Sequence, residues 1–294
     1  MASTDRDADD RELIESVGPW RFTTRRTYRL RDGSRAVWQS RHHRKRLPPA
    51  VPSEQLSPRA ILLRSLWMPW HMSWWIGVVF AVGSSLFALG SILSLAPSLA
   101  RSWSFNPNTI SAIFFAGSIP FSTAAYLQLF QAANAAELTA SGRSVSRSVL
   151  FLGWRPRDIG WLSCALQFGG TLLFNLSTFD AIRPDSRWIQ QNLEIWVPDL
   201  VGSILFLCSG YLAFAEVCHA RWAWKPASLS WWVTVINLLG CLAFMASALF
   251  AFVPPRPPNL DAATISVAFT LLGALSFLAG SLLMLPETAA PAKP

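Results

Sequence analysis

Residues 67–91 read WMPWHMSWWIGVVFAVGSSLFALGS, and the spacing of their tryptophan, proline, glycine and phenylalanine residues occurs three times in the chain. The shared pattern is Trp-x-Pro-x4-Trp-x8-Gly-x3-Phe, which begins at Trp67, Trp154 and Trp224. Each copy is followed, 34, 32 or 33 residues after its glycine, by a second glycine with a phenylalanine four residues on. The repeating unit is therefore predicted to be a pair of apolar helices.

Each predicted helix carries one of these glycines near its middle, with the phenylalanine one turn later on the same face. A glycine lets a neighbouring helix approach closely in a membrane, and a ring can fill the adjoining groove. We expect a helix-packing motif at Gly83, Phe87, Gly117, Phe121, Gly170, Phe174, Gly202, Phe206, Gly240, Phe244, Gly273 and Phe277.

The composition places the chain among membrane proteins. Its 294 residues are 52% hydrophobic and only 14% charged, which is outside the range of an ordinary soluble domain. The apolar residues form runs long enough to cross ~30 Å of hydrocarbon. We predict an all-α integral membrane protein of three repeated helical hairpins, with six transmembrane helices near residues 73–95, 109–130, 159–178, 196–217, 229–253 and 263–285.

The remaining segments complete the predicted organisation. Residues 1–18 are acidic and polar, and we expect them to be disordered. Asp32-Gly33 lies between two β-leaning segments and predicts a two-stranded ribbon with a type I′ turn. The expected boundaries are a basic N-terminal segment with a proline-containing linker (1–58), an interfacial helix (59–72), hairpins (73–130, 159–217, 229–285), loops (131–158, 218–228) and a tail (286–294).

The distribution of basic residues predicts the orientation. Of the 25 Lys and Arg residues, 21 lie before the first helix, after the last one, or in the loops on that same side. Cytoplasmic segments carry the excess of Lys and Arg, so both termini are predicted to be cytoplasmic. Residues 1–15 lack the apolar core of a signal peptide, so we expect the first helix to act as its own insertion signal.

Residues 20–46 contain ten Lys or Arg residues opposed by Asp32 alone. These charges either bind anionic lipid headgroups, at about 1 kcal/mol per basic residue, or contact a cytoplasmic protein, or only fix the topology. Nucleic acid is disfavoured because no recognised nucleic-acid-binding motif accompanies the charge. The candidate contacts with anionic lipid are Arg21, Arg25, Arg26, Arg29, Arg31, Arg35, Arg41, Arg44, Lys45 and Arg46.

Polar residues inside membrane spans are functional candidates by default. Gln167 and Asn175 lie eight residues apart on one face of the third helix, and Asn237 is their isolated counterpart on the fifth. These amides either line a polar path or hydrogen-bond between helices. Asp199 follows Pro198 at the expected start of the fourth helix, where a carboxylate complements the helix dipole.

Three further polar residues occupy matching positions, 14 residues after the glycines of the even-numbered helices: Gln131, Glu216 and Glu287. They could form a ring that gathers cations or protons, or the carboxylates could pair with Arg and Lys of the neighbouring loops. The candidate polar path is accordingly Gln167, Asn175, Asn237, Glu216 and Glu287.

Signatures of catalysis are lacking in the sequence. It contains no HExxH, no GxSxG and no phosphate-binding glycine loop, and its four cysteines do not have the spacing of metal ligands. We therefore predict no enzymatic activity, no cofactor and no metal.

The Gly-Ser-x-x-Phe units at Gly83, Gly117 and Gly202 resemble the YrhK-like family of small bacterial membrane hairpins. The wider chain, over residues 67–287, looks like a group of bacterial integral membrane proteins of similar length. The other three helices depart from the motif with Thr, Cys or Ala in place of Ser. The resemblance implies a bacterial cytoplasmic membrane protein, and it brings no activity or catalytic residue.

Two functions from different classes follow. The first is a non-enzymatic membrane scaffold, sensor or interaction protein. The alternative is a small-solute or ion conduit along the pseudo-threefold axis, with the amides lining it and Glu216 and Glu287 at its mouth. Packing separates the two: a continuous wet cavity favours the conduit, whereas phenylalanines that fill the axis disfavour it.

Overall fold

A computed structural model of the protein describes residues 12–47, 57–135, 137–138, 144–145, 149–183, 187–252 and 260–290. Within these residues six helices are long and apolar enough to cross a membrane, which confirms the predicted number of spans. The protein is therefore a multi-pass membrane protein. The long helices are α3 (Met72–Leu95), α5 (Pro107–Ala133), α6 (Ile159–Asp180), α8 (Val197–Cys218), α9 (Leu229–Phe250) and α10 (Leu260–Ala289).

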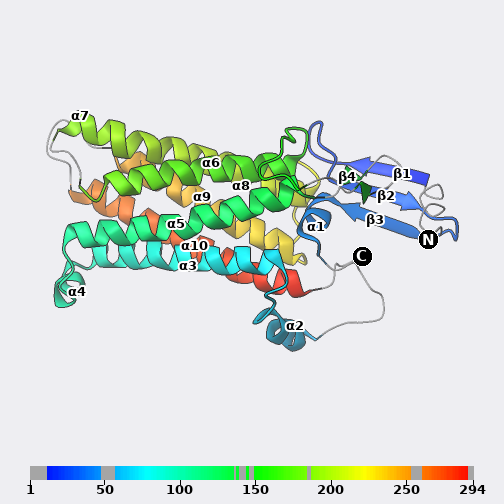
Figure 1. Cartoon of the computed structure of the whole chain (residues 1–294), viewed down its shortest axis with the longest axis horizontal. Coiled ribbons are helices and arrows are strands. Elements are labelled where there is room, and N and C mark those ends of the chain that lie inside the picture. Colours follow the sequence, from blue (N-terminus) through cyan, green and yellow to red (C-terminus); the bar gives the residue numbers. More distant parts are fainter. Residues whose placement is uncertain are drawn as a thin grey trace.

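The six long helices form a closed ring in which each packs against two neighbours. The order around the ring is α3, α5, α6, α8, α9 and α10, and α10 returns to α3. A β-sheet lies beyond one end of this bundle, which we name the sheet end (Figure 1). The opposite or far end carries the short helices α4 (Pro97–Ser102) and α7 (Trp188–Gln191).

Glycines bring the paired helices into close contact. A Cβ atom on Gly83 of α3 would lie 2.9 Å from the carbonyl oxygen of Gly117 in α5, and one on Gly117 would lie 3.2 Å from the carbonyl oxygen of Gly83. Gly170 of α6 and Gly202 of α8 face each other in the same way, at 3.0 and 3.2 Å. A side chain at these positions would force the helices apart, so only glycine permits this backbone separation.

Phenylalanines occupy the middle of the ring. The six rings of the packing motif are all buried and belong to one core cluster. Rings from different hairpins touch along the axis, with Phe87 and Phe244 centroids 6.2 Å apart and Phe206 and Phe277 centroids 6.0 Å apart. We call this set the phenylalanine layer: Phe87, Phe121, Phe174, Phe206, Phe244 and Phe277.

The tryptophans that lead into each hairpin make matching contacts at the sheet end. The indole N–H of the second tryptophan donates to a backbone carbonyl eight or nine residues earlier, at 2.9 or 3.0 Å. The rings meet edge-on, with centroids 5.7, 5.4 and 4.9 Å apart, in the pairs Trp67–Trp74, Trp154–Trp161 and Trp224–Trp231. These contacts support the threefold repeat, which stays a prediction.

The sheet has three antiparallel strands in the order β1 (Glu12–Val17), β2 (Arg25–Arg29) and β3 (Arg35–Gln39). The prediction of a disordered tail through residue 18 was wrong for 12–17, because this segment pairs with β2 and turns the expected ribbon into a sheet. The turn also differs from type I′, which needs positive φ at two residues. Only Gly33 has it, at +79°, and Asp32 instead accepts hydrogen bonds from Ser34.

Several predicted boundaries shift. The interfacial helix is shorter than expected, since α2 (Pro58–Ser65) ends before Pro69, and proline disfavours a helical residue ahead of it. Helix α10 continues through Pro286 to Ala289, so the expected tail at 286–294 is partly helical. Asp199 lies in the first turn of α8 as predicted, but α7, a π-helical turn (Asn192–Trp196) and α8 run on from Trp188, so its carboxylate meets no free helix N-terminus.

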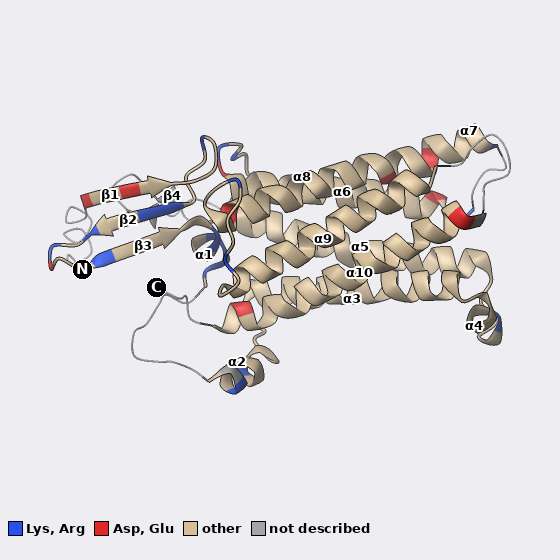
Figure 2. Ribbon diagram, turned by 180° about the vertical axis from the view of Figure 1, so that it is seen from behind, with Lys and Arg blue, Asp and Glu red and all other residues tan. Residues whose placement is uncertain are grey.

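Parts of the predicted linker (48–56), of the loop at 131–158 and of the last loop (253–259) lie outside the described residues, as do residues 1–11 and 291–294. The described part of the first loop includes two short paired strands, β4 (Glu137–Leu138) and β5 (Ser144–Val145). Lys and Arg gather over the sheet and the sheet end of the bundle, and few lie along the long helices (Figure 2).

Candidate functional site

A short helix joins the sheet to the bundle. Strand β3 ends at Gln39, and α1 (Ser40–Lys45) begins at the next residue, without a linker. Helix α1 ends where Arg46 adopts a left-handed φ of 50°. Arg41, Arg44 and Lys45 lie three and four residues apart and share one face of the helix. All three are buried, because this face is inserted into the sheet end of the bundle.

The buried cations pair with two carboxylates of the transmembrane helices. Arg41 donates two hydrogen bonds to Glu287 of α10, at 3.0 and 3.2 Å, and Lys45 donates to the same carboxylate at 2.6 Å. Arg44 donates to Glu216 of α8 at 2.7 Å. Such charge-assisted bonds are about twice as strong as neutral ones. Helix α1 is thus fixed to α8 and α10 by ion pairs away from water.

The third matching polar residue also supports α1. Gln131 of α5 donates through its Nε2 to the hydroxyl of Ser73, at 3.0 Å. That hydroxyl in turn donates to the backbone carbonyl of Lys45, at 3.3 Å. The positions of Gln131, Glu216 and Glu287 therefore all hold α1, directly or through one side chain. The expectation that the carboxylates pair with the loops was wrong, because the cations come from residues 41–45.

Gly160, near the start of α6, makes room for this arrangement. A Cβ atom there would lie 2.5 Å from Nε of Arg44 and 2.9 Å from Oε1 of Glu216. Asp158, the residue that caps α6, lies close by and accepts hydrogen bonds from the backbone N–H groups of Gly160 and Trp161. Burial, together with the charge of Glu216, raises the pKa of Asp158.

The pKa values of the basic residues of α1 shift in different directions. Burial by itself lowers the pKa of Arg44, but the Glu216 carboxylate outweighs it and raises that pKa above its ordinary value. Burial and the neighbouring charge of Arg41 lower the pKa of Lys45 to about 8, although Glu287 opposes the shift. Burial also lowers the pKa of His42. Arg44 therefore stays charged at neutral pH, whereas Lys45 loses its proton in mild alkali.

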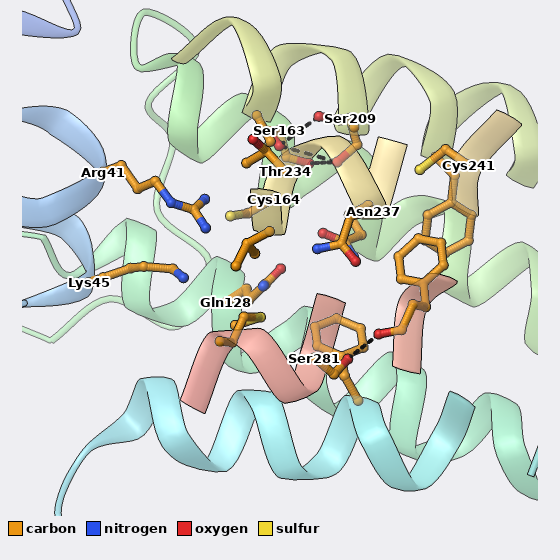
Figure 3. Close-up of a pocket in the computed structure, with 18 of the residues that line it drawn as sticks. Arg41, Lys45, Gln128, Ser163, Cys164, Ser209, Thr234, Asn237, Cys241 and Ser281 are labelled. Carbon is orange, nitrogen blue, oxygen red and sulfur yellow. Dashed lines mark hydrogen bonds between the residues drawn. The ribbon is translucent and has the colours of Figure 1, made fainter. Parts of the chain in front are cut away.

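Beneath α1 lies a cavity of ≈ 50 Å³ inside the ring. The head groups of Arg41 and Lys45 point toward it from the sheet end, and the amides of Gln128 and Asn237 lie on its wall (Figure 3). Phe206 and Phe277 of the phenylalanine layer line it as well. The cavity is therefore bounded by α1 above and by aromatic rings below.

The five residues of the candidate polar path lie in different places. Gln167 and Asn237 line the cavity, but Asn175 does not: its Nδ2 donates to the hydroxyl of Ser122 at 2.8 Å, between α6 and α5. Glu216 and Glu287 lie behind the cations of α1 and do not line the cavity. The five predicted residues therefore do not form one continuous path.

The ten candidate contacts with anionic lipid differ in burial and in their partners. Arg41, Arg44 and Lys45 are buried in ion pairs, so the structure removes them from that set. Arg26 lies 5.5 Å from the ring of Trp38, and Arg29 forms an exposed pair with Glu12. Arg25 is half-buried, and the exposed remainder are Arg21, Arg31, Arg35 and Arg46.

A second hollow, of ≈ 500 Å³, lies between α1, the loop from α8 to α9, and the end of α10. His42, His219 and Lys225 line it. His219 contacts the hydroxyl of Thr24 at 3.0 Å, which ties the sheet to α8. Burial, followed by the charges of Lys225 and Arg25, lowers the pKa of His219 to about 4. Among the described residues no three His, Cys, Asp or Glu side chains lie close enough together to hold a metal ion.

Sequence reasoning missed the role of α1 and of Gln128. The signal for α1 was present, since Arg41, Arg44 and Lys45 have the spacing of one helical face. Their partners lie between 172 and 246 residues away, however, and no local pattern connects them. Gln128 lies inside an apolar helix and was recognisable as an intramembrane polar residue.

Comparisons of the chain with protein-family models, with curated proteins and with solved structures found no match. The resemblance to the YrhK-like family stays a prediction based on the Gly-Ser-x-x-Phe units.

Proposed function

We propose that this protein is a non-enzymatic membrane sensor that couples the interior of its helix bundle to the sheet. The observation that carries the proposal is the insertion of α1 into the bundle. Because β3 and α1 are adjacent in the chain, any displacement of α1 moves an edge strand of the sheet. A change in the bundle that weakens the ion pairs of α1 is thereby transmitted to the sheet, which lies beyond the end of the bundle.

Other contacts also join the sheet and its loops to the bundle within the described residues. Besides the contact of His219 with Thr24, Trp20 meets Tyr211 edge-on at 5.9 Å, and Arg221 lies over the ring of Trp20 at the same distance. Contacts of these kinds contribute about 1 kcal/mol each, whereas breaking a buried ion pair costs about 3–5 kcal/mol. The ion pairs of α1 therefore dominate the coupling.

We further propose that the sheet lies in the cytoplasm of a bacterial cell, with the bundle in the cytoplasmic membrane and both termini inside. The excess of Lys and Arg at the sheet end supports this orientation. Fusion of a reporter that is active only in the cytoplasm to residue 294 tests it. Activity of that reporter is expected, and activity of a reporter that works only outside the membrane would contradict the orientation.

The exposed basic residues of the hairpin favour a protein partner. Arg31 and Arg35 flank the turn between β2 and β3, which lies at the end of the sheet away from the bundle (Figures 1 and 2). In the proposed orientation this turn projects into the cytoplasm and away from the lipid headgroups. An acidic protein surface is therefore the partner that this turn suits, in preference to anionic lipid.

Hydrogen exchange of the purified full-length protein in detergent tests the coupling. Replacement of both carboxylates, in Glu216→Gln with Glu287→Gln, removes the partners of all three cations. We expect exchange in α1 and β3 to become at least tenfold faster, while exchange in the core of α3 and α6 stays unchanged. Asp261→Asn is the matched control, because it neutralises an exposed carboxylate on α10 at the far end. Equal exchange in α1 and β3 of the double variant and the control would contradict the proposal.

A small-solute or ion conduit is the second candidate, which the cavity lined by Gln167 and Asn237 favours. The phenylalanine layer opposes it, because the rings occupy the axis. Ion flux into proteoliposomes that contain the purified protein separates the candidates. The sensor proposal predicts no flux; flux that Gln167→Met abolishes and Asn175→Leu retains would establish the conduit instead.

A further inference from the structure

The cavity beneath α1 has a cationic lining. Arg41, Arg44 and Lys45 contribute to its wall, whereas the carboxylates that pair with them, Glu216 and Glu287, do not. The positive ends of these ion pairs therefore face this cavity, whereas Glu216 faces the surrounding helices and Glu287 lines the second hollow. An enclosed space of this kind attracts negative charge, and the low polarity of its surroundings strengthens that attraction.

Three carboxamides on the same wall have no partner. Gln128 of α5, Gln167 of α6 and Asn237 of α9 form no hydrogen bond with another described residue, and the Oδ1 atom of Asn237 is fully buried. Nε of Arg44 is also buried without a partner, but this atom lies against Gly160 of α6. Buried polar groups in proteins are nearly always hydrogen-bonded to protein, water or ligand. Carboxamide N–H groups from three helices and the cationic head groups of α1 thus line a space that the described residues leave unfilled.

The hydroxyl groups that line the cavity are not free to donate hydrogen bonds to a ligand. Ser163 donates to the backbone carbonyl of Ser209, and Thr234 donates to carbonyls of its own helix. Their protons are therefore engaged, and the free donors of the site are the carboxamides and the cationic head groups. A ligand that accepts hydrogen bonds and carries negative charge satisfies the N–H donors best, and a water beside it would donate to the amide oxygens, of which Oδ1 of Asn237 is buried without a partner.

The size of the cavity limits the ligand. A volume of ≈ 50 Å³ holds about four water molecules, at 10–15 Å³ each. A halide or nitrate ion fits within it, together with one or two waters. A lipid headgroup does not, because it is larger than this space between α1 and the rings of Phe206 and Phe277.

We propose that this cavity is a binding site for a small monovalent inorganic anion of the halide or nitrate class, held by the cations of α1 and by the amides of Gln128, Gln167 and Asn237. The consequence of binding rests on the proposed function. An anion that contacts α1, α5, α6 and α9 at once holds α1 in the bundle, and its loss releases α1 and β3. The anion is thus the signal that the sensor detects.

Thermal denaturation of the purified full-length protein in detergent tests the site, with the anion varied at constant ionic strength. Sodium chloride or sodium nitrate replaces sodium gluconate, whose anion is too large for the cavity. We expect the midpoint to rise by several degrees, saturably, with chloride or nitrate. The same midpoint in all three salts would overturn the proposal and leave water as the occupant.

Variants at the amides locate the effect. Asn237→Leu and, independently, Gln167→Met each remove a donor without changing a charge, and each is expected to weaken the apparent affinity for the anion at least tenfold. Asn175→Leu is the matched control, since this amide lies on α6 two turns beyond Gln167 and outside the cavity. Wild-type affinity in both cavity variants would overturn the proposed site.

Hydrogen exchange separates this inference from the proposed function. Protection of α1 and β3 that increases with chloride supports both. Anion-dependent stabilisation without a change in exchange of α1 and β3 would retain the site and overturn the coupling. Faster exchange in the double carboxylate variant, with no response of the native protein to any anion, would retain the coupling and overturn the anion site.

Discussion

The interior of the bundle differs sharply between its two sides. Toward the sheet end it holds a cavity of ≈ 50 Å³ with three buried cations and three unpartnered amides. Within the phenylalanine layer itself a smaller space of ≈ 10 Å³ is lined by five of its rings, together with Ser118 and Thr171. The sheet side therefore holds a cavity lined by charged and amide side chains, whereas rings fill the middle of the bundle; a buried amide oxygen without a partner occurs on each side, in Asn237 and in Asn175.

The difference shows what each side requires of the chain. Close packing of the middle depends on residues that recur at fixed spacing, because glycine and phenylalanine act between neighbouring helices. The polar side depends on a helix from outside the bundle, because Glu216 and Glu287 would otherwise be carboxylates without partners. The repeat thus builds the ring, and the N-terminal segment completes it.

Among variants that compare the two sides of the bundle, Glu287→Gln is expected to lower the free energy of unfolding the most. This change leaves Arg41 and Lys45 buried without their carboxylate, which destabilises a protein by about 3–5 kcal/mol. The free energy of unfolding, measured by denaturant titration in detergent, is the test. Asp261→Asn on the same helix is the control, and an equally small effect for both would show that the ion pairs are not needed for stability.

A smaller effect is expected at the glycines of the packed side. In Gly170→Ala the added Cβ would lie 3.0 Å from the carbonyl oxygen of Gly202, so the helices must separate, at about 1–3 kcal/mol. The adjacent Gly169→Ala meets only Leu205, at an ordinary 3.6 Å, and alanine is the better helix former by about 1 kcal/mol. Thermal denaturation is expected to show a lower midpoint for the first variant and an equal or higher one for the second. The reverse order would contradict the close contact of these helices.

Local sequence patterns predicted the parts of the fold that depend on local chemistry. The six spans follow from the length and composition of the apolar runs, so they were predictable. The tryptophans that lead into each hairpin were recognisable as a repeat, but their edge-on contacts and indole hydrogen bonds depend on the path of the chain between them. Sequence spacing alone gives no direction to a side chain.

The candidate site depends on contacts between distant parts of the chain, and this is why the sequence did not predict it. Arg41 and Glu287 are separated by 246 residues, and nothing distinguishes Arg41 from the other basic residues of its segment except its helical spacing with Arg44 and Lys45. Strand β1 was missed for the same reason, because Glu12–Val17 is acidic and gains its structure only by pairing with the basic β2.

The link between sheet and bundle is expected to depend on pH through His219. Its folded-state pKa of about 4 lies below the unfolded value of about 6.5, so the unfolded chain binds the additional proton between these values. Stability therefore falls as the pH falls from about 6.5 to about 4, and we expect this histidine to contribute about 1 kcal/mol of that loss after allowance for its partial exposure.

Removal of the histidine tests this dependence. Asn tolerates the left-handed conformation of residue 219, at φ 55°, and does not titrate. In His219→Asn the free energy of unfolding is expected to vary less between pH 6.5 and pH 4 than in the native protein. An unchanged pH profile would show that His219 is not a titrating contact between the sheet and α8.

The smallest effects compare one amide from each side of the bundle, in gluconate so that no small anion is bound. Asn175 donates a hydrogen bond to Ser122, although its Oδ1 is buried without a partner, so Asn175→Leu is expected to destabilise the protein by at most about 0.6 kcal/mol, the typical contribution of such a bond between membrane helices. Asn237 forms no hydrogen bond with the described residues, and removing a buried polar group without a partner is neutral or stabilising. Asn237→Leu should therefore equal or exceed the native free energy of unfolding, by up to about 1 kcal/mol. In chloride, the native protein should then have a higher free energy of unfolding than Asn237→Leu. This result would show that the cavity responds to an anion because its polar groups lack partners when no anion is bound.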